Sequence, residues 1–293
     1  MIRFTPDKPL PTAIVDKIIK IRMEEIDAHE ETSMEKVMST DGTEIAFEKS
    51  GRGPALIIVG GSLADHQFYI PLANELSTHF TVYTYDRRGR GQSGDTSPYA
   101  VERELEDLAA LIDHARGPVF VYGHSAGSAL ALRAAASGLG ISKLVLADPP
   151  FTPHSDNDEV AEAEFAEEAA RLQELHDKGD HRASVKLFLG GMGMPDEAIE
   201  GVLDSPAGKS MVDSARALPY DYAMLGDGLV PTSRAAKVTV PTVILAAREM
   251  PETAQALANA MPNARFEAMD GPAHETTPAD IAQRITRFLE SQA

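Results

Sequence analysis

Short apolar runs alternate with longer segments of helical periodicity along most of the chain. The apolar runs are nearly continuous, which is typical of strands that are buried on both faces. This alternation predicts an α/β fold, with a mostly parallel sheet and helices on both of its faces. The runs assigned to this sheet are ALIIVGG (55–61), FTVYTYD (80–86), VFVYGHS (119–125), KLVLADP (143–149), TVILAAR (242–248) and FEAMD (266–270).

Two further strand patterns precede this series. MEKVMS (34–39) and EIAFEKS (44–50) flank Asp41-Gly42, a dipeptide that favours a tight hairpin turn. We expect these two strands to form an antiparallel edge of the sheet. A closing helix is predicted at 279–291.

The alternation is interrupted over 151–231, which contains no buried-strand run. Helical periodicity recurs there in three stretches, at 158–179, 182–191 and 205–218. We therefore predict a helical cap at 151–231, inserted into an α/β core made of 36–150 and 232–293.

Residues 1–35 precede the strands and form an N-terminal extension with an amphipathic pattern, in which Ile14, Ile18 and Ile26 share one helical face. We expect this helix to pack against the body of the protein. Packing against a second copy of the chain, in a homodimer, and closure over the site as a lid are the alternatives left open.

Composition narrows the class of protein. The chain has 293 residues, a net charge of −18 and no cysteine. Strong acidity disfavours binding to nucleic acid or anionic lipid, so we expect neither partner. The absence of cysteine excludes disulfides, thiolate metal sites and a thiol nucleophile. With no HExxH or GxxxxGK[ST] pattern, neither a metal nor another cofactor is expected.

The cellular location is predicted from what the sequence lacks. No apolar run approaches the roughly 18 residues that a membrane-spanning helix needs. The first residues also lack the apolar stretch of a secretory signal. We therefore expect a soluble, cytoplasmic protein.

The strongest chemical signal is GHSAG at 123–127, between the apolar run VFVY and the helix-forming run SALALRAAA. In such a GxSxG elbow the turn from strand to helix is so tight that flanking side chains would clash, and the serine is exposed at its tip. The helix N-terminus offers unpaired N–H groups to a developing oxyanion. Ser125 is therefore the predicted nucleophile.

With three other motifs, this elbow resembles the α/β-hydrolase family from about Asp41 to the end of the chain. Gly60-Gly61-Ser62 resembles the oxyanion loop, with Gly60 where the family often has His. This alignment implies that the N–H groups of Ser62 and Ala126 form the oxyanion hole. DRRGRGQS (86–93) resembles the family's DxRGxGxS turn, which shapes the body near the site without doing chemistry.

The remaining motif supplies the base. DGPAH (270–274) follows the last predicted strand and precedes a helix, where the family carries its catalytic histidine. An imidazole with a pKa near neutrality accepts the serine proton and returns it to the leaving group. The resemblance therefore implies that His274 is the general base.

The acid of the triad departs from the family's commonest pattern, because Met250 stands where Asp is expected. Some relatives, including certain haloalkane dehalogenases and zearalenone lactonases, carry the acid one strand earlier, and Asp148 occupies that position. A carboxylate there can fix the tautomer of the histidine. Asp148 is the preferred acid, Glu249 and Glu252 are the alternatives, and a turn-capping role for Asp148 remains open.

These residues predict a serine hydrolase that cleaves a carboxylic ester or lactone of a small to medium apolar substrate through an acyl-enzyme. Gly61, His124 and Phe151 are the candidate substrate-binding residues, with local packing as the other interpretation of His124 and Phe151. Two other functions fit the same sequence. One is a non-catalytic ligand-binding homologue, which Met250 would suit, and the other is a carbon-carbon hydrolase or lyase that uses the same Ser-His pair.

Overall fold

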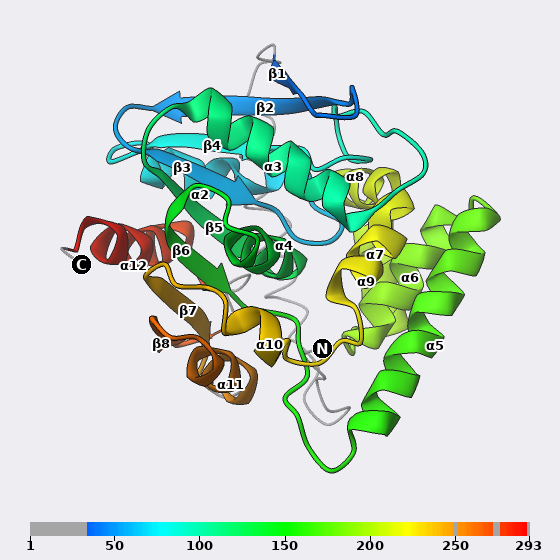
Figure 1. The fold of residues 1–293 in the computed structure, drawn as a ribbon. Coiled ribbons are helices and arrows are strands. Elements are labelled where there is room, and N and C mark those ends of the chain that lie inside the picture. The colour runs from blue at the N-terminus through cyan, green and yellow to red at the C-terminus, as the bar shows by residue number, and fades with distance from the viewer. Residues whose placement is uncertain (1–33, 249–250, 272–275, 292–293) are drawn as a thin grey trace.

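A computed structural model describes residues 34–248, 251–271 and 276–291. These residues form an eight-stranded sheet in the order β1-β2-β4-β3-β5-β6-β7-β8 (Figure 1). The strands are β1 (Glu35–Met38), β2 (Glu44–Gly51), β3 (Ala55–Val59), β4 (Thr81–Tyr85), β5 (Val119–His124), β6 (Ile141–Ala147), β7 (Thr242–Ala247) and β8 (Ala264–Met269). The amphipathic helix predicted within 1–35 lies outside the described residues.

The direction of pairing changes once across the sheet. β1 pairs with β2, and β2 with β4, in antiparallel orientation, whereas the pairings from β4 across to β8 are parallel. In the β1–β2 turn, Gly42 has a φ of 85° and the Thr43 N–H donates to Asp41 Oδ1. The predicted α/β fold and its antiparallel edge are confirmed.

Helices cover both faces of the sheet. α2 (Ile70–Leu76) and α12 (Pro278–Glu290) contribute to the core on one face. α3 (Val101–Ala115), α4 (Ala126–Ala136) and α11 (Glu252–Ala260) contribute to the core on the other. The closing helix predicted from the C-terminal pattern is α12.

β3 shows why the apolar runs are continuous. Ile57 and Val59 belong to the core beneath α3 and α4, whereas Leu56 and Ile58 belong to the core beneath α2 and α12. All four side chains are at most 1% exposed. Since successive side chains of a strand point to opposite faces, a strand between two helical layers needs apolar residues at every position.

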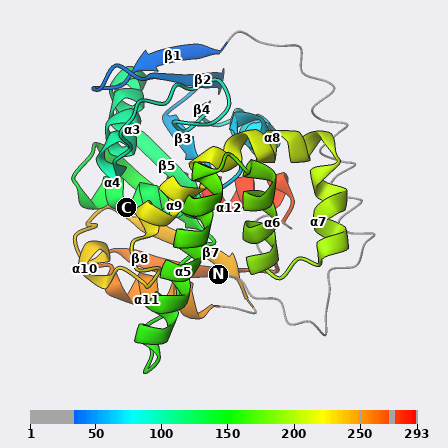
Figure 2. The same cartoon turned by 90° about the vertical axis from the view of Figure 1, so that its right-hand side faces the viewer.

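The segment between β6 and β7 is helical. We call α5 to α9 the helical insertion: α5 (Asp158–Asp177), α6 (His181–Gly191), α7 (Asp196–Leu203), α8 (Pro206–Ser214) and α9 (Leu218–Leu225). These helices lie together to one side of the sheet in Figure 1 and face the viewer in Figure 2. They enclose a core of their own that includes Leu172, Val185 and Ile199. A short helix, α10 (Thr232–Ala235), leads back to the sheet.

The three stretches predicted as helical correspond to α5, α6 and α8, whereas α7 and α9 were not predicted. Both missed helices have eight residues, and neither has a side-chain hydrogen bond at its N-cap. Eight residues make only about two helical turns, so their periodic pattern is difficult to recognise in the sequence. The exact boundaries of the predicted division into core and cap remain a prediction.

The helical insertion contacts the loops that follow the carboxyl ends of β3 and β4. Ser210 of α8 donates a hydrogen bond to Asp65, which follows β3. Asp221 of α9 accepts hydrogen bonds from Arg87 and Arg90, which follow β4. The carboxyl ends of the parallel strands, where α/β sheets carry their sites, therefore face the insertion.

Candidate active site

The elbow between β5 and α4 has the geometry that its sequence predicts. Ser125 has a φ of 51° and a ψ of −124°, a strained conformation for a residue with a side chain. A Cβ at Gly123 would lie 2.6 Å from the Gly127 carbonyl oxygen, and a Cβ at Gly127 would lie 2.1 Å from that of Val59. Both positions therefore require glycine, and together they hold Ser125 at the tip of the turn.

Backbone and side-chain hydrogen bonds fix this elbow against β6. The Ser125 N–H donates to the Ala147 carbonyl at 2.9 Å. The buried Ser128 hydroxyl donates towards the carbonyls of Gly123 and Ala147, each at 2.8 Å. The strain at Ser125 is thus sustained by bonds on both sides of it.

The loop after β3 lies directly against Ser125. A Cβ at Gly61 would lie 3.1 Å from Ser125 Cβ and 3.7 Å from its Oγ. Leu63, in the same loop, has a φ of 59° and is 5% exposed. Gly61 therefore lies beside the nucleophile, while its contact with substrate and the oxyanion role of Ser62 and Ala126 remain predictions.

The turn DRRGRGQS after β4 is built on Asp86, which is completely buried. Its carboxylate accepts hydrogen bonds from the backbone N–H groups of His66 and Gln92, and from the His66 ring. A Cβ at Gly91 would lie 2.1 Å from that carboxylate, so only glycine fits there. Burial lowers the pKa of His66, but the hydrogen bond and the charge of Asp86 outweigh it, and the pKa is raised above its ordinary value.

Arg87 joins this turn to the helical insertion and to the loop after β3. Its guanidinium donates to Glu104 of α3, to Asp221 of α9 and to the Gly60 carbonyl. Arg90 donates to both carboxylate oxygens of Asp221 at 2.8 Å. Each of these four charged side chains is at most 1% exposed.

Asp221 stays ionised inside this cluster. Burial raises its pKa, but the charges of Arg90 and Arg87 and a hydrogen bond from Ser62 outweigh burial and lower it. Asp221, a residue of the helical insertion, thus lies beside Ser62, the predicted oxyanion residue. Nothing in the sequence around Asp221 indicates this position, because its partners lie far away along the chain.

Asp148 directly follows β6, with a φ of 45° and a half-buried side chain. Its N–H donates to the Leu245 carbonyl of β7 at 2.9 Å. Since Ala147 pairs with His124 across the β5–β6 ladder, Asp148 and Ser125 leave neighbouring strands at the same edge of the sheet. Its role as triad acid remains a prediction.

The other predicted triad residues are His274, Glu249 and Glu252. His274 and Glu249 lie outside the described residues. Glu252 is the first residue of α11 and is exposed. Arg248 and Asp270 form an ion pair of 3.1 Å across the ends of β7 and β8, with side chains that are 66% and 83% exposed.

His124 and Phe151 were expected to contact substrate. His124 is 9% exposed, and its Nδ1 lies 3.0 Å from the hydroxyl of Tyr69. Phe151 is 2% exposed, belongs to the core beneath α3 and α4, and accepts a hydrogen bond from Thr253 at its carbonyl. Local packing describes the Phe151 side chain well, and substrate contact by either residue remains a prediction.

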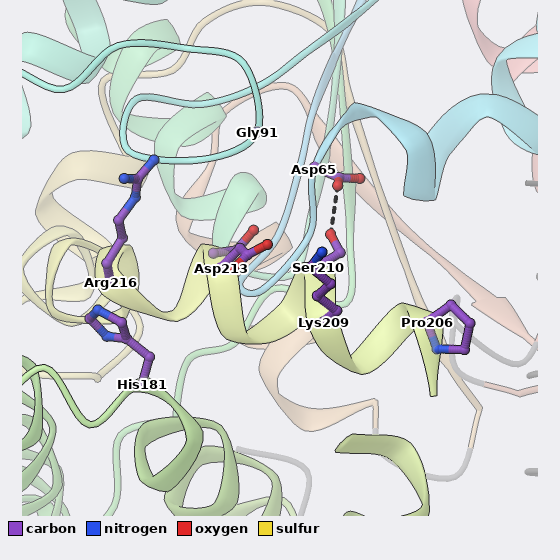
Figure 3. Close-up of a pocket in the computed structure, with 9 residues that line it drawn as sticks. Asp65, Gly91, His181, Pro206, Lys209, Ser210, Asp213 and Arg216 are labelled. Atoms are coloured by element: carbon purple, nitrogen blue, oxygen red, sulfur yellow. Dashed lines mark hydrogen bonds between the residues drawn. The ribbon is translucent and has the colours of Figure 1, made fainter. Parts of the chain in front are cut away.

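A cavity of about 540 Å³ opens between the core and the helical insertion (Figure 3). Asp65 and Gly91 line it from the core, and His181, Lys209 and Arg216 line it from the insertion. Its walls carry charges of both signs. Ser125 is not among the described residues that line this cavity.

Within the described ranges, no group of three His, Asp or Glu side chains is arranged to hold a metal ion. No described helix is long and apolar enough to cross a membrane.

Comparison with known proteins identifies the family. A family model described as "Alpha/beta hydrolase family" matches residues 55–284. An alpha/beta hydrolase structure from Sphaerobacter thermophilus is 41% identical, with a TM-score of 0.76, over 87% of this chain and 100% of that one. The chain therefore belongs to the alpha/beta hydrolase family.

Two curated relatives carry more specific names. The 2-(acetamidomethylene)succinate hydrolase of Mesorhizobium japonicum is 26% identical over 83% of this chain and 90% of that protein. The N-formylmaleamate deformylase of Pseudomonas putida is 38% identical over 107 residues, which are 35% of this chain and 40% of the deformylase. The match with the deformylase thus spans less than half of that protein.

Proposed function

We propose that this protein is a serine hydrolase that cleaves a carboxylic ester or lactone of a small to medium substrate through an acyl-enzyme. The observation that carries the proposal is the strained Ser125, at a φ of 51°, beside a glycine loop that approaches its Oγ. Backbone strain of this kind costs stability and is concentrated at functional sites. Membership of the alpha/beta hydrolase family supports hydrolysis as the class of reaction.

In the proposed reaction, Ser125 Oγ attacks the acyl carbon as His274 takes the hydroxyl proton. The N–H groups of Ser62 and Ala126 stabilise the resulting oxyanion. Collapse of the tetrahedral intermediate breaks the bond to the leaving group, which receives the proton from His274. Water then attacks the acyl-enzyme by the same sequence and releases the acid and the free serine.

Asp148 is the proposed acid that orients His274. The position of Asp148 supports this role, because the residue follows β6, next to the strand that leads to Ser125. Its side chain is half-buried. Glu252 is less well placed, because it is exposed at the start of α11. Glu249 remains the second alternative.

A second candidate substrate class is a small carboxylate-bearing N-acyl compound. The names of the two curated relatives, 2-(acetamidomethylene)succinate hydrolase and N-formylmaleamate deformylase, favour it. The same acyl-enzyme chemistry serves both classes, with the leaving group a nitrogen in place of an oxygen. We propose that the helical insertion acts as the cap that selects between them.

The test combines a fluorophosphonate probe, followed by intact mass, with turnover assays. The substrates are p-nitrophenyl acetate, butyrate and octanoate, together with N-formyl and N-acetyl enamides that carry carboxylates. Ser125→Ala should abolish labelling and lower kcat by about 10⁶. Ser137→Ala, the same change at the other end of α4, should match the wild type in both assays. Folded wild type that neither labels nor turns over would favour the non-catalytic ligand-binding alternative.

A further inference from the structure

We propose that Tyr69 is a positioning residue of this site, whose hydroxyl holds the two sides of the oxyanion hole at a fixed separation. The inference rests on the proposed function, because it concerns the same Ser125 chemistry. The Gly61 N–H donates a hydrogen bond of 2.8 Å to the Tyr69 hydroxyl. The same hydroxyl lies 3.0 Å from Nδ1 of His124, the residue before Ser125.

These two contacts belong to opposite sides of the site. Gly61 lies in the loop after β3, next to the predicted donor Ser62. His124 lies in the elbow, two residues before the predicted donor Ala126. One phenol thus contacts both segments that carry the oxyanion donors. Because such donors act only when aimed at the place where charge develops, their separation controls the rate.

The Tyr69 ring also explains why residue 60 is glycine. A Cβ at Gly60 would lie 2.9 Å from Tyr69 Cε2, closer than side-chain carbons approach. This is the position where the sequence departs from the histidine that the family often has. The tyrosine ring occupies that space, reaching from η1 (His66–Tyr69) across the loop to the elbow.

The direction of the two hydrogen bonds of the Tyr69 hydroxyl follows from which groups have a proton to donate. A phenol that accepts from the Gly61 N–H keeps its own proton to donate, and His124 Nδ1 is an acceptor within reach. In this arrangement His124 carries its ring proton on Nε2. The chain of bonds runs from the loop, through Tyr69, to the elbow, and it is sheltered because Tyr69 is 5% and His124 9% exposed.

The test is Tyr69→Phe, which removes the hydroxyl and keeps the ring beside Gly60. The matched control is Tyr85→Phe. Tyr85 is 4% exposed, and its hydroxyl is buried without a hydrogen-bond partner among the described residues. Each variant is titrated with the fluorophosphonate probe to count competent sites, and kcat and KM are measured per competent site on the best ester.

We expect Tyr69→Phe to lower kcat by about tenfold, less than the loss of a whole oxyanion donor, with KM within about twofold. The affinity for a trifluoromethyl ketone, which forms an oxyanion on Ser125, should fall by the same factor as kcat/KM. A merely structural tyrosine would lower the number of competent sites without changing kcat per site. Tyr85→Phe should match the wild type.

A second pair of variants tests the contact between His124 and Tyr69. It replaces the first test if Tyr69→Phe does not fold. Asparagine at position 124 can place an amide oxygen near the present Nδ1, whereas alanine cannot. His124→Asn should therefore retain more of kcat than His124→Ala, although both lose the rest of the ring.

Three results would overturn the inference. They are a kcat per site for Tyr69→Phe within twofold of the wild type, an equal loss in Tyr85→Phe, and identical kcat values for His124→Asn and His124→Ala. Failure of the proposed function is seen separately, in wild type that neither labels nor turns over, and it removes the inference as well.

Discussion

Two groups of polar contacts at the carboxyl ends of the strands differ in burial: those of the loops after β3 and β4, and the ion pair of Arg248 and Asp270 after β7 and β8. In the first group, buried polar side chains bind the backbone, as Tyr69 binds Gly61 and Arg87 binds Gly60. In the second group, the ion pair between Arg248 and Asp270 lies in solvent. Buried charges are costly unless they are paired, whereas exposed pairs contribute little. We therefore expect buried side chains to preorganise the oxyanion side of the site, and the exposed ion pair to contribute little to stability.

The largest expected effect concerns Asp148, which leaves the sheet at β6, between these two groups of contacts. Asp148→Asn should lower kcat by about 10⁴, because the amide no longer fixes the tautomer of His274 or stabilises the imidazolium. Glu249→Gln and Glu252→Gln should stay within a few-fold of the wild type in the same steady-state assay. If Asp148→Asn is nearly wild type and one of the glutamine variants collapses, the acid has been assigned to the wrong residue.

The next effect compares the stability of the two groups directly. Asp221→Asn leaves Arg90 without its buried carboxylate partner and should lower the free energy of unfolding by about 3 kcal/mol. Asp270→Asn removes an exposed partner and should change it by at most about 1 kcal/mol. Urea unfolding of both variants measures the difference, and equal losses would refute the contrast between the groups.

The smallest effect concerns the turn after β4, where Arg88 binds Asp41 of the β1–β2 turn. Burial raises the pKa of Asp41, but hydrogen bonds from Arg88 and Thr43 outweigh it and lower the pKa from 3.8 to about 2. Because the folded-state pKa is lowered, the carboxylate stabilises the fold above the unfolded pKa, and this contribution is lost as the pH falls towards the folded pKa.

The measurement is urea unfolding of wild type and Asp41→Asn as the pH falls from about 5 to about 3. The stability advantage of the wild type should shrink over this interval. An advantage that stays constant with pH would mean that Asp41 acts through packing and hydrogen bonding, without a contribution from its charge.

Much of the fold could be predicted because its signals are local. Continuous apolar runs marked the central strands, and Asp41-Gly42 marked the turn of the antiparallel edge. The short helices α7 and α9 were missed, since eight residues give only about two turns of periodic pattern. Their positions are determined by packing against the rest of the helical insertion.

The candidate site divides in the same way. The spacing of Gly123 and Gly127 around Ser125 was enough for the sequence by itself to determine the elbow and the serine at its tip. The turn itself requires Gly123, whose Cβ would meet the Gly127 carbonyl oxygen, whereas Gly127 is required by the approach of Val59 in β3. Only the tertiary structure decided that Asp221 lies against Arg87, which is 134 residues away, and that Tyr69 fills the space beside Gly60. The physical reason is that tight turns impose steric demands on adjacent residues, whereas a buried charge or phenol finds its partners only when distant segments fold together.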